Sequence, residues 1–372
     1  MTQRILTETQ LPANSTLFQK SFQFATLLEQ LTLTRITPDA VRIPEHGLRA
    51  LTARSVLLGF TILVCIALIS VRPALGEELA VPAAAHEALG KIYSGDFQAS
   101  VEVAREMEQA QSEHPLGYIL EAEALWWKIW CTSAEFKYGM TYARHRLKLS
   151  SDQPYLDLAT KASSLAEAEI ARHDTAEMRF YAGMGNALAA RLYSLRGDNH
   201  GAARAGVHAR EYLLRAVALD PQIADADFGL GLYNYYADTL SGIARILRFF
   251  MGIPGGNKQQ GIRQLEHAMN DGVLTQTEAR FYLAVNLHNY DHQYERALQL
   301  AAPLAEKYPS NPLFQLIVGD LFAKLGHKEK AAKYYRAAAA LQAPDQECRA
   351  HVQDLARASL AAVAADPQAS HR

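Results

Sequence analysis

The chain has 372 residues, 20% of them charged, and a formal net charge of −2. This near-neutral balance gives no electrostatic reason to expect a nucleic-acid-binding protein, whose affinity rests on clustered Lys and Arg. The length suits one extended helical array or two compact domains. Alanine is abundant, whereas glycine and proline are sparse inside the stretches with apolar periodicity, and this pattern predicts an all-α chain.

The N-terminal part of the chain differs from the rest. Residues 1–48 show no sustained periodicity, and we interpret them as a polar leader that is not translated if the true start lies near Leu48 or Leu51. Residues 49–76 combine Arg49 and Arg54, an apolar run and small residues before Glu77, which is typical of a secretory signal. The apolar run is shorter than the roughly 20 residues that span a bilayer, but an uncleaved signal anchor stays open as the alternative.

These features predict an exported protein, either periplasmic or anchored to the inner membrane by its uncleaved signal. The cysteines add little to this prediction. Cys65 lies in the apolar run, and Cys131 and Cys348 are more than 200 positions apart. An exported protein can pair the last two, but we expect two buried or free thiols.

From residue 77 onward the sequence predicts one helix after another. Pro115, Pro221 and Pro309 follow polar residues at the ends of periodic stretches, because proline lacks the N–H that continues a helix. The predicted helices cover residues 83–94, 98–111, 116–131, 155–172, 175–196, a long stretch ending at 219, 224–236, 258–270, 277–290, 294–307, 312–325, 328–341 and 345–364. We expect the last of them to cover an apolar end, and residues 367–372 to form a disordered tail.

Two segments interrupt this order, at residues 132–152 and 237–257. Both are rich in basic and aromatic residues, and we interpret each as an inserted amphipathic helix. Such a helix can lie on an anionic membrane surface or hold a peptide carboxylate. We favour the alternative in which its apolar face packs on the neighbouring unit while the arginines are solvated. The candidate contact residues are Tyr142, Arg144 and Arg146 in the first insertion and Arg245, Arg248, Phe249 and Phe250 in the second.

The last two helical pairs carry equivalent residues 34 positions apart, as Ala297 and Ala331 show. Counting from Pro312, a small residue, Gly319, stands in the first helix of the pair and Gly326 stands at the turn. In this respect the chain resembles the tetratricopeptide-repeat (TPR) family, whose helix–turn–helix units stack into a solenoid.

The resemblance implies an all-α fold, an α-solenoid of about six TPR-like helical hairpins over residues 77–366, with the two inserted helices and a C-terminal capping helix. It is strong at both ends of this range and weak between them. Residues 222–290 also resemble exported bacterial TPR proteins of unassigned function. More weakly, they are similar to a mitochondrial outer-membrane TPR family linked to inclusion-body clearance. Neither similarity implies a catalytic residue.

Aromatic residues on the predicted helices allow two interpretations. Trp126 and Trp130 share a helical face at i, i+4, and core packing is the interpretation that we favour. The alternative is a concave aromatic pocket joined by Tyr233, Tyr235 and Tyr236, with Asn234 holding a peptide backbone.

The sequence contains no pattern typical of a metal site, a P-loop or a nucleophilic enzyme, so we expect no cofactor and no catalysis. The predicted function is a non-catalytic protein–protein interaction scaffold in the cell envelope, with a concave surface that docks a protein or peptide. The alternative is a peripheral membrane-binding protein that uses the two insertions on an anionic membrane surface.

Overall fold

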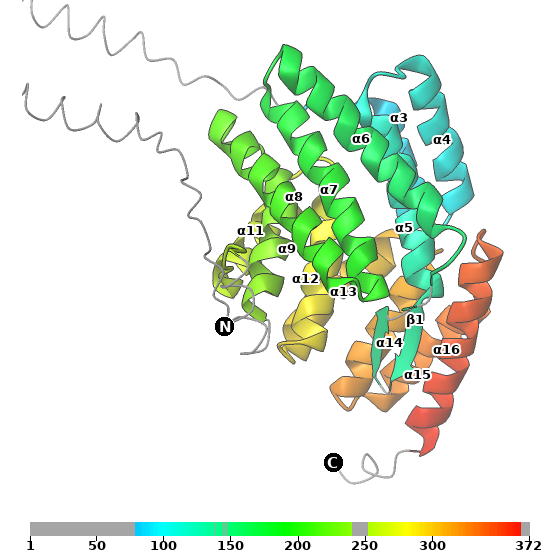
Figure 1. The fold of residues 1–372 in the computed structure, drawn as a ribbon. Coiled ribbons are helices and arrows are strands. Elements are labelled where there is room, and N and C mark those ends of the chain that lie inside the picture. The colour runs from blue at the N-terminus through cyan, green and yellow to red at the C-terminus, as the bar shows by residue number, and fades with distance from the viewer. Residues whose placement is uncertain (1–78, 138, 144–145, 147, 240–251, 366–372) are drawn as a thin grey trace, which may run out of the picture. The chain divides into compact units, whose positions relative to one another are not determined.

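The computed structural model describes residues 79–137, 139–143, 146, 148–239 and 252–365. The predicted leader, signal segment and C-terminal tail, and most of the second insertion, lie outside these residues. In the described part the chain is helical apart from one short hairpin of strands, which confirms the predicted all-α class (Figure 1). No helix within these residues is long and apolar enough to cross a membrane.

The helices follow the predicted order closely. They are α3 (Ala83–Tyr93), α4 (Phe97–Ala110), α5 (Pro115–Thr132), α6 (Asp152–Arg172), α7 (Ala176–Arg196), α8 (Asn199–Leu219), α9 (Ala226–Thr239), α11 (Lys258–Asp271), α12 (Gln276–Asn289), α13 (Tyr294–Lys307), α14 (Pro312–Lys324), α15 (Lys328–Ala340) and α16 (Gln346–Ala365).

Local capping explains many of these limits. The carboxylates of Asp96 and Asp198 accept hydrogen bonds from the first turns of α4 and α8, and the side chain of Asn257 does the same for α11. Gly197 ends α7 with a φ of 80°, in the left-handed region that glycine adopts without strain. Each of these signals involves only neighbouring residues, so it can be read from the sequence.

Each helix packs against the next helix along the chain, from α3 to α16. Ala297 and Ala331 are both the fourth residue of their helices, α13 and α15, and both are fully buried. A Cβ atom placed on Gly319 of α14 would lie only 2.7 Å from the ring of Tyr335 on α15. Small residues therefore let paired helices approach closely, as the repeat pattern predicts.

The helices α5, α12 and α14 are buried on nearly every side, whereas α4, α11 and α13 bury one stripe. The ring of Trp127 on α5 contacts those of Phe281 on α12 and Phe314 on α14, with centroids 4.6 and 5.9 Å apart. The amide of Asn311, before α14, donates to the carbonyl oxygen of Tyr93 at the end of α3. Late helices thus pack directly on early ones, and the row of helices returns on itself.

The first insertion is not a helix, contrary to our prediction. It forms an antiparallel hairpin of β1 (Ala134–Lys137) and β2 (Met140–Ala143). Lys137 pairs with Met140 across a turn that contains Gly139, whose φ is 60°. A left-handed glycine between residues that favour strands is a hairpin signal, and it outweighs the amphipathic pattern of basic and aromatic residues that we had assigned to a helix.

Three hydrogen bonds fix this hairpin on helices from the second half of the chain. The imidazole Nε2 of His288 on α12 donates to the carbonyl oxygen of Gly139 at 2.8 Å. The hydroxyl of Thr141 donates to the buried carboxylate of Asp320 on α14. The ring of His351 on α16 reaches the carbonyl oxygen of Ala134. The insertion therefore packs on α12, α14 and α16 and links these helices to the end of α5.

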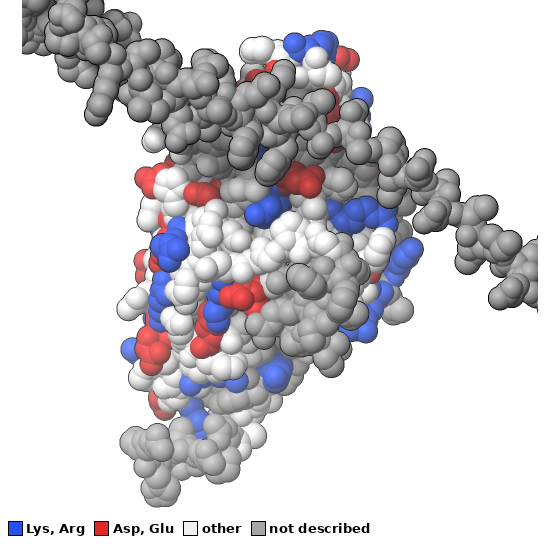
Figure 2. All heavy atoms as spheres, turned by 60° about the vertical axis from the view of Figure 1, so that its left-hand side comes forward, with Lys and Arg blue, Asp and Glu red and all other residues white. Residues whose placement is uncertain are grey.

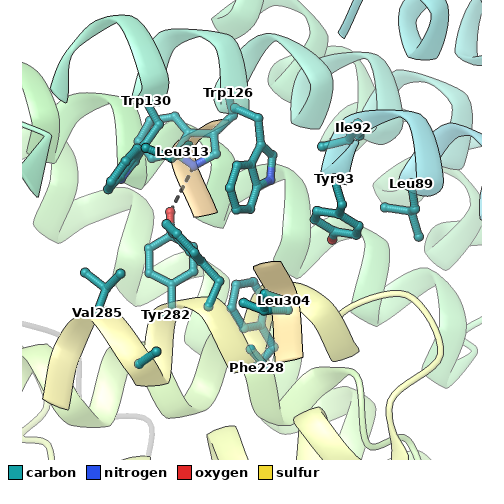
Figure 3. Packing of buried hydrophobic residues seen from close by; sticks show 14 of the residues in the cluster. Leu89, Ile92, Tyr93, Trp126, Trp130, Phe228, Tyr282, Val285, Leu304 and Leu313 are labelled. Carbon is teal, nitrogen blue, oxygen red and sulfur yellow. Dashed lines mark hydrogen bonds between the residues drawn. The ribbon is translucent and has the colours of Figure 1, made fainter. Parts of the chain in front are cut away.

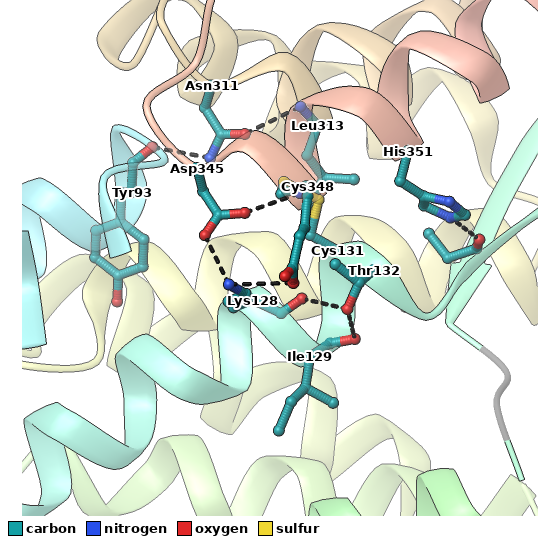
Figure 4. The surroundings of a disulfide bond; sticks show 12 residues. Tyr93, Lys128, Ile129, Cys131, Thr132, Asn311, Leu313, Asp345, Cys348 and His351 are labelled. Carbon is teal, nitrogen blue, oxygen red and sulfur yellow. Dashed lines mark hydrogen bonds and ion pairs between the residues drawn. A yellow bond between two sulfur atoms is a disulfide. The ribbon is translucent and has the colours of Figure 1, made fainter. Parts of the chain in front are cut away.

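Cys131 and Cys348 form a disulfide, contrary to the free thiols that we expected (Figure 4). Beside it, the ammonium group of Lys128 on α5 lies 3.1 Å from the carboxylate of Asp345 and 3.2 Å from that of Glu347. The two cysteines are 217 positions apart, so only the return of α16 to α5 brings them together.

Candidate functional site

The tryptophans of α5 lie in the core rather than on an accessible face (Figure 3). Trp126 and Trp130 are 5% and 6% exposed. The indole nitrogen of Trp126 donates to the hydroxyl of Tyr282 at 2.9 Å, and the ring of Trp130 meets that of Phe281 edge-on. These rings fasten α5 to α12, so they are not accessible to a partner in this conformation.

Tyr233 and Asn234 on α9 are half-buried and engaged with their own chain. The hydroxyl of Tyr233 donates to the carbonyl oxygen of Pro254, and the guanidinium of Arg210 lies 5.4 Å from the centre of its ring. The amide nitrogen of Asn234 donates to the side-chain oxygen of Gln264 on α11. Both side chains thus hold α9 against its neighbours.

The candidate residues of the insertions are only partly described. The hydroxyl of Tyr142 donates to the carboxylate of Glu135 on the opposite strand. Arg146 is exposed, and its side chain lies close to Gly197. The remaining candidates lie outside the described residues: Arg144, Arg245, Arg248, Phe249 and Phe250.

Charges of both signs are interspersed on the face shown in Figure 2. Several cations elsewhere on the surface are paired across helices, such as Arg296 with Glu266 and Lys258 with Asp291. Pairs of this kind offset positive charge locally, whereas binding to a nucleic acid or an anionic membrane is favoured by clustered positive charge.

Two tyrosines form an exposed aromatic pair where α9 and α12 end. Tyr236 is 36% exposed and Tyr290 is 52% exposed, and their ring centroids are 6.1 Å apart. Asn286 of α12 holds this end of α9. Its side-chain oxygen accepts from the hydroxyl of Tyr236, and its carbonyl oxygen accepts from the hydroxyl of the buried Tyr235. Our interpretation of the sequence grouped Tyr235 and Tyr236 with the aromatic pocket but missed Tyr290, which directly follows a helix end.

A charged cluster that the sequence interpretation missed lies inside the protein. Arg191 of α7 reaches between two buried glutamates and donates through Nη2 to Glu123 of α5 and through Nη1 to Glu278 of α12. Its guanidinium carbon also lies 5.0 Å from the centre of the Trp126 ring. We call Glu123, Arg191 and Glu278 the buried triad.

Burial dominates the electrostatics of the buried triad. It raises the pKa of Glu278, the charge of Glu123 raises it further, and Arg191 opposes both effects. One carboxylate oxygen of Glu123 and Nε of Arg191 have no hydrogen-bond partner. Glu123 and Glu278 also line a cavity of about 20 Å³, large enough for one water molecule. The arrangement pairs these charges inside the protein.

A second carboxylate pair lies on the other side of α5. Residues two positions apart on a helix point in nearly opposite directions, so Glu121 faces α4 while Glu123 faces the core. Glu121 accepts from Arg105, and burial together with the hydrogen bond to Glu121 raises the pKa of Glu108 to about 7. The sequence signal that could have revealed both clusters is the presence of Glu121 and Glu123 in an otherwise apolar helix.

Asp320 is a third buried carboxyl group, 1% exposed within α14. Its oxygens accept from the hydroxyls of Thr141 on the hairpin and Tyr335 on α15. Burial raises its pKa to about 7, although both hydrogen bonds act in the opposite direction. The role that follows from these contacts is to hold three elements together.

No model of a known family matches the sequence. No curated protein matches it either.

Proposed function

We propose that this protein is a non-catalytic scaffold that binds a protein partner, and that its helical hairpins form a TPR-like solenoid. The close approach of Gly319 to Tyr335 and the equivalent burial of Ala297 and Ala331 support the repeat interpretation. Arrays of helical hairpins usually serve as binding surfaces, because successive units present a long series of side chains.

The observation that carries this proposal is the exposed pair of Tyr236 and Tyr290. In the described part of the chain, many other aromatic side chains fill the core, as those of Trp126 and Phe281 do. Tyrosine is enriched at protein interfaces, where it combines a large contact area with a polar end. Because the interior face of the helices is filled by its own rings, the partner is proposed to bind on the outer surface around this pair.

Proximity labelling in intact cells tests this docking surface. The full chain is compared with a Tyr236→Ala, Tyr290→Ala double variant and with a Leu214→Ala control, since Leu214 is an exposed residue on a different helix, α8. We expect one or more proteins to be enriched by the wild type and the control and lost with the double variant. An unchanged set of labelled proteins, from a double variant of normal abundance, would remove the tyrosine pair as the binding surface.

We also propose that the protein is exported. The buried disulfide between Cys131 and Cys348 supports this, because such bonds persist in oxidising compartments and are rare in the reducing cytosol. Thiol labelling in intact cells, together with mass spectrometry of the native N-terminus, tests the proposal. Free thiols at both positions would contradict export. A peptide from residues 5–35 in the isolated protein would contradict the interpretation that residues 1–48 are not translated.

A further inference from the structure

The charges of the buried triad do not balance when all three groups are ionised. Glu123 and Glu278 are 4% and 3% exposed, and Arg191 is the cation that contacts both of them. Two carboxylates and one guanidinium would leave a net negative charge in the core, where the solvation of an ion is largely lost. One bound proton removes that excess charge.

We propose that the buried triad is a proton-binding site that holds α5, α7 and α12 together, with one proton shared between Glu123 and Glu278. The two carboxyl groups belong to helices far apart in the chain, and Arg191 on a third helix contacts both. The proposal does not rest on a role in partner binding.

Arg191 is the cation whose charge acts on the pKa of Glu278. Tyr93 of α3, Tyr155 of α6 and Tyr282 of α12 surround it, and burial raises the pKa of all three, so they stay neutral. Trp126 covers the guanidinium, and Thr275 and Tyr181 line the adjoining cavity. The hydroxyl of Tyr181 is directed to Glu177.

The site makes the junction of the three helices sensitive to alkaline pH. A glutamate in the unfolded chain loses its proton near pH 4.3, whereas the folded pair keeps one proton to a higher pH. The folded state therefore binds more protons than the unfolded state above this pH. The contribution of the site to stability is complete below about pH 4.3 and is lost as the pH rises through the pKa of the folded pair, by up to tenfold in the unfolding equilibrium constant for each pH unit.

The test compares urea unfolding of the full chain between pH 5 and pH 9 with that of Glu278→Gln. Glutamine mimics a protonated carboxyl group, because its oxygen accepts from Arg191 and its NH₂ group can donate to Glu123. Over this range the unfolding equilibrium constant of the wild type should rise at least tenfold more than that of the variant. Glu306→Gln, at an exposed position on α13, should follow the wild type. A Glu278→Gln profile parallel to that of the wild type would overturn the proposal.

An infrared measurement keeps the proposal testable if Glu278→Gln fails to fold. Difference spectra of the wild type between pH 6 and pH 10 should show a buried protonated carboxyl band that disappears as the pH rises. Glu108→Gln and Asp320→Asn separate the signals of the two other carboxyl groups whose pKa is raised. If the band is absent from the double variant that carries both Glu108→Gln and Asp320→Asn, the triad holds no proton and the proposal fails.

Discussion

Cys131, near the end of α5, is bonded to Cys348, near the start of α16, 217 residues later in the chain. Both side chains are buried, at 0% and 2% exposure. The disulfide therefore joins α16, the last helix of the row, to α5, which lies near its beginning. It works together with the hairpin of strands, which bonds to α12, α14 and α16 from the same end of α5.

Removing this disulfide should destabilise the fold strongly. A cross-link that closes so long a loop restricts the unfolded chain, and the loss of a native disulfide typically costs about 2–5 kcal/mol. We expect Cys131→Ser, Cys348→Ser to lower the free energy of unfolding in urea by this amount. The control is the wild type with its disulfide intact. Equal midpoints for the double variant and the control would show that the bond contributes nothing to stability.

Two glycines with different surroundings, Gly319 and Gly90, should respond in opposite ways to substitution by alanine. In Gly319→Ala the new Cβ would lie 2.7 Å from the tyrosine ring, so we expect a loss of about 1–3 kcal/mol from overpacking. Gly90 lies in α3, where a new Cβ would meet open space, so Gly90→Ala should gain up to about 1 kcal/mol of helix propensity. Thermal unfolding of both variants checks the pair, and a stabilising Gly319→Ala would show that the helices are not closely packed there.

Arg191 and Arg296 should differ sharply in their importance. Arg191→Met leaves two buried glutamates without their cation, and we expect a cost of about 3–5 kcal/mol at neutral pH. Arg296→Met removes an ion pair with Glu266 in which both side chains are 39% exposed, and we expect a loss below about 1 kcal/mol. Chemical denaturation at pH 7 measures both, and similar losses in the two variants would contradict the assignment of the buried cluster.

His288 should make the hairpin sensitive to acid. Burial lowers its pKa from 6.5 to about 4, although the hydrogen bond to Gly139 acts in the opposite direction. Between these pH values the unfolded chain binds more protons than the folded chain, so the contribution of His288 is complete above pH 6.5 and is lost as the pH falls toward 4.

The measurement is an NMR titration of the His288 ring together with the exchange of the β2 amides. We expect the ring to stay neutral at pH 5.5 and the amides to exchange faster as it becomes protonated. His288→Gln retains a donor for Gly139 but cannot titrate in this range, so its amides should lose the acid response. A ring that titrates near pH 6.5 in the folded protein would refute the prediction.

The sequence predicted the helices well because their limits depend on neighbouring residues. Proline at position 312, glycine at 197 and the capping carboxylates of Asp96 and Asp198 act within one turn of the helix that they end or begin. The hairpin was missed because the apolar and basic residues of the first insertion satisfy a helical pattern as well as a strand pattern. Its choice of strands is stabilised by contacts to Asp320 and His288, which lie far along the chain.

Successive helices can be predicted from the sequence alone, because capping groups, breakers and apolar periodicity act over a few residues. The three-dimensional packing of the helices was needed to reveal that the row returns on itself, so that Trp127 contacts Phe314 and Cys131 is bonded to Cys348. It also decided that Glu123, Arg191 and Glu278 share one buried site. These contacts join helices that are far apart in the chain. Burying their aromatic and charged side chains together changes the free energy only after the helices have packed against one another.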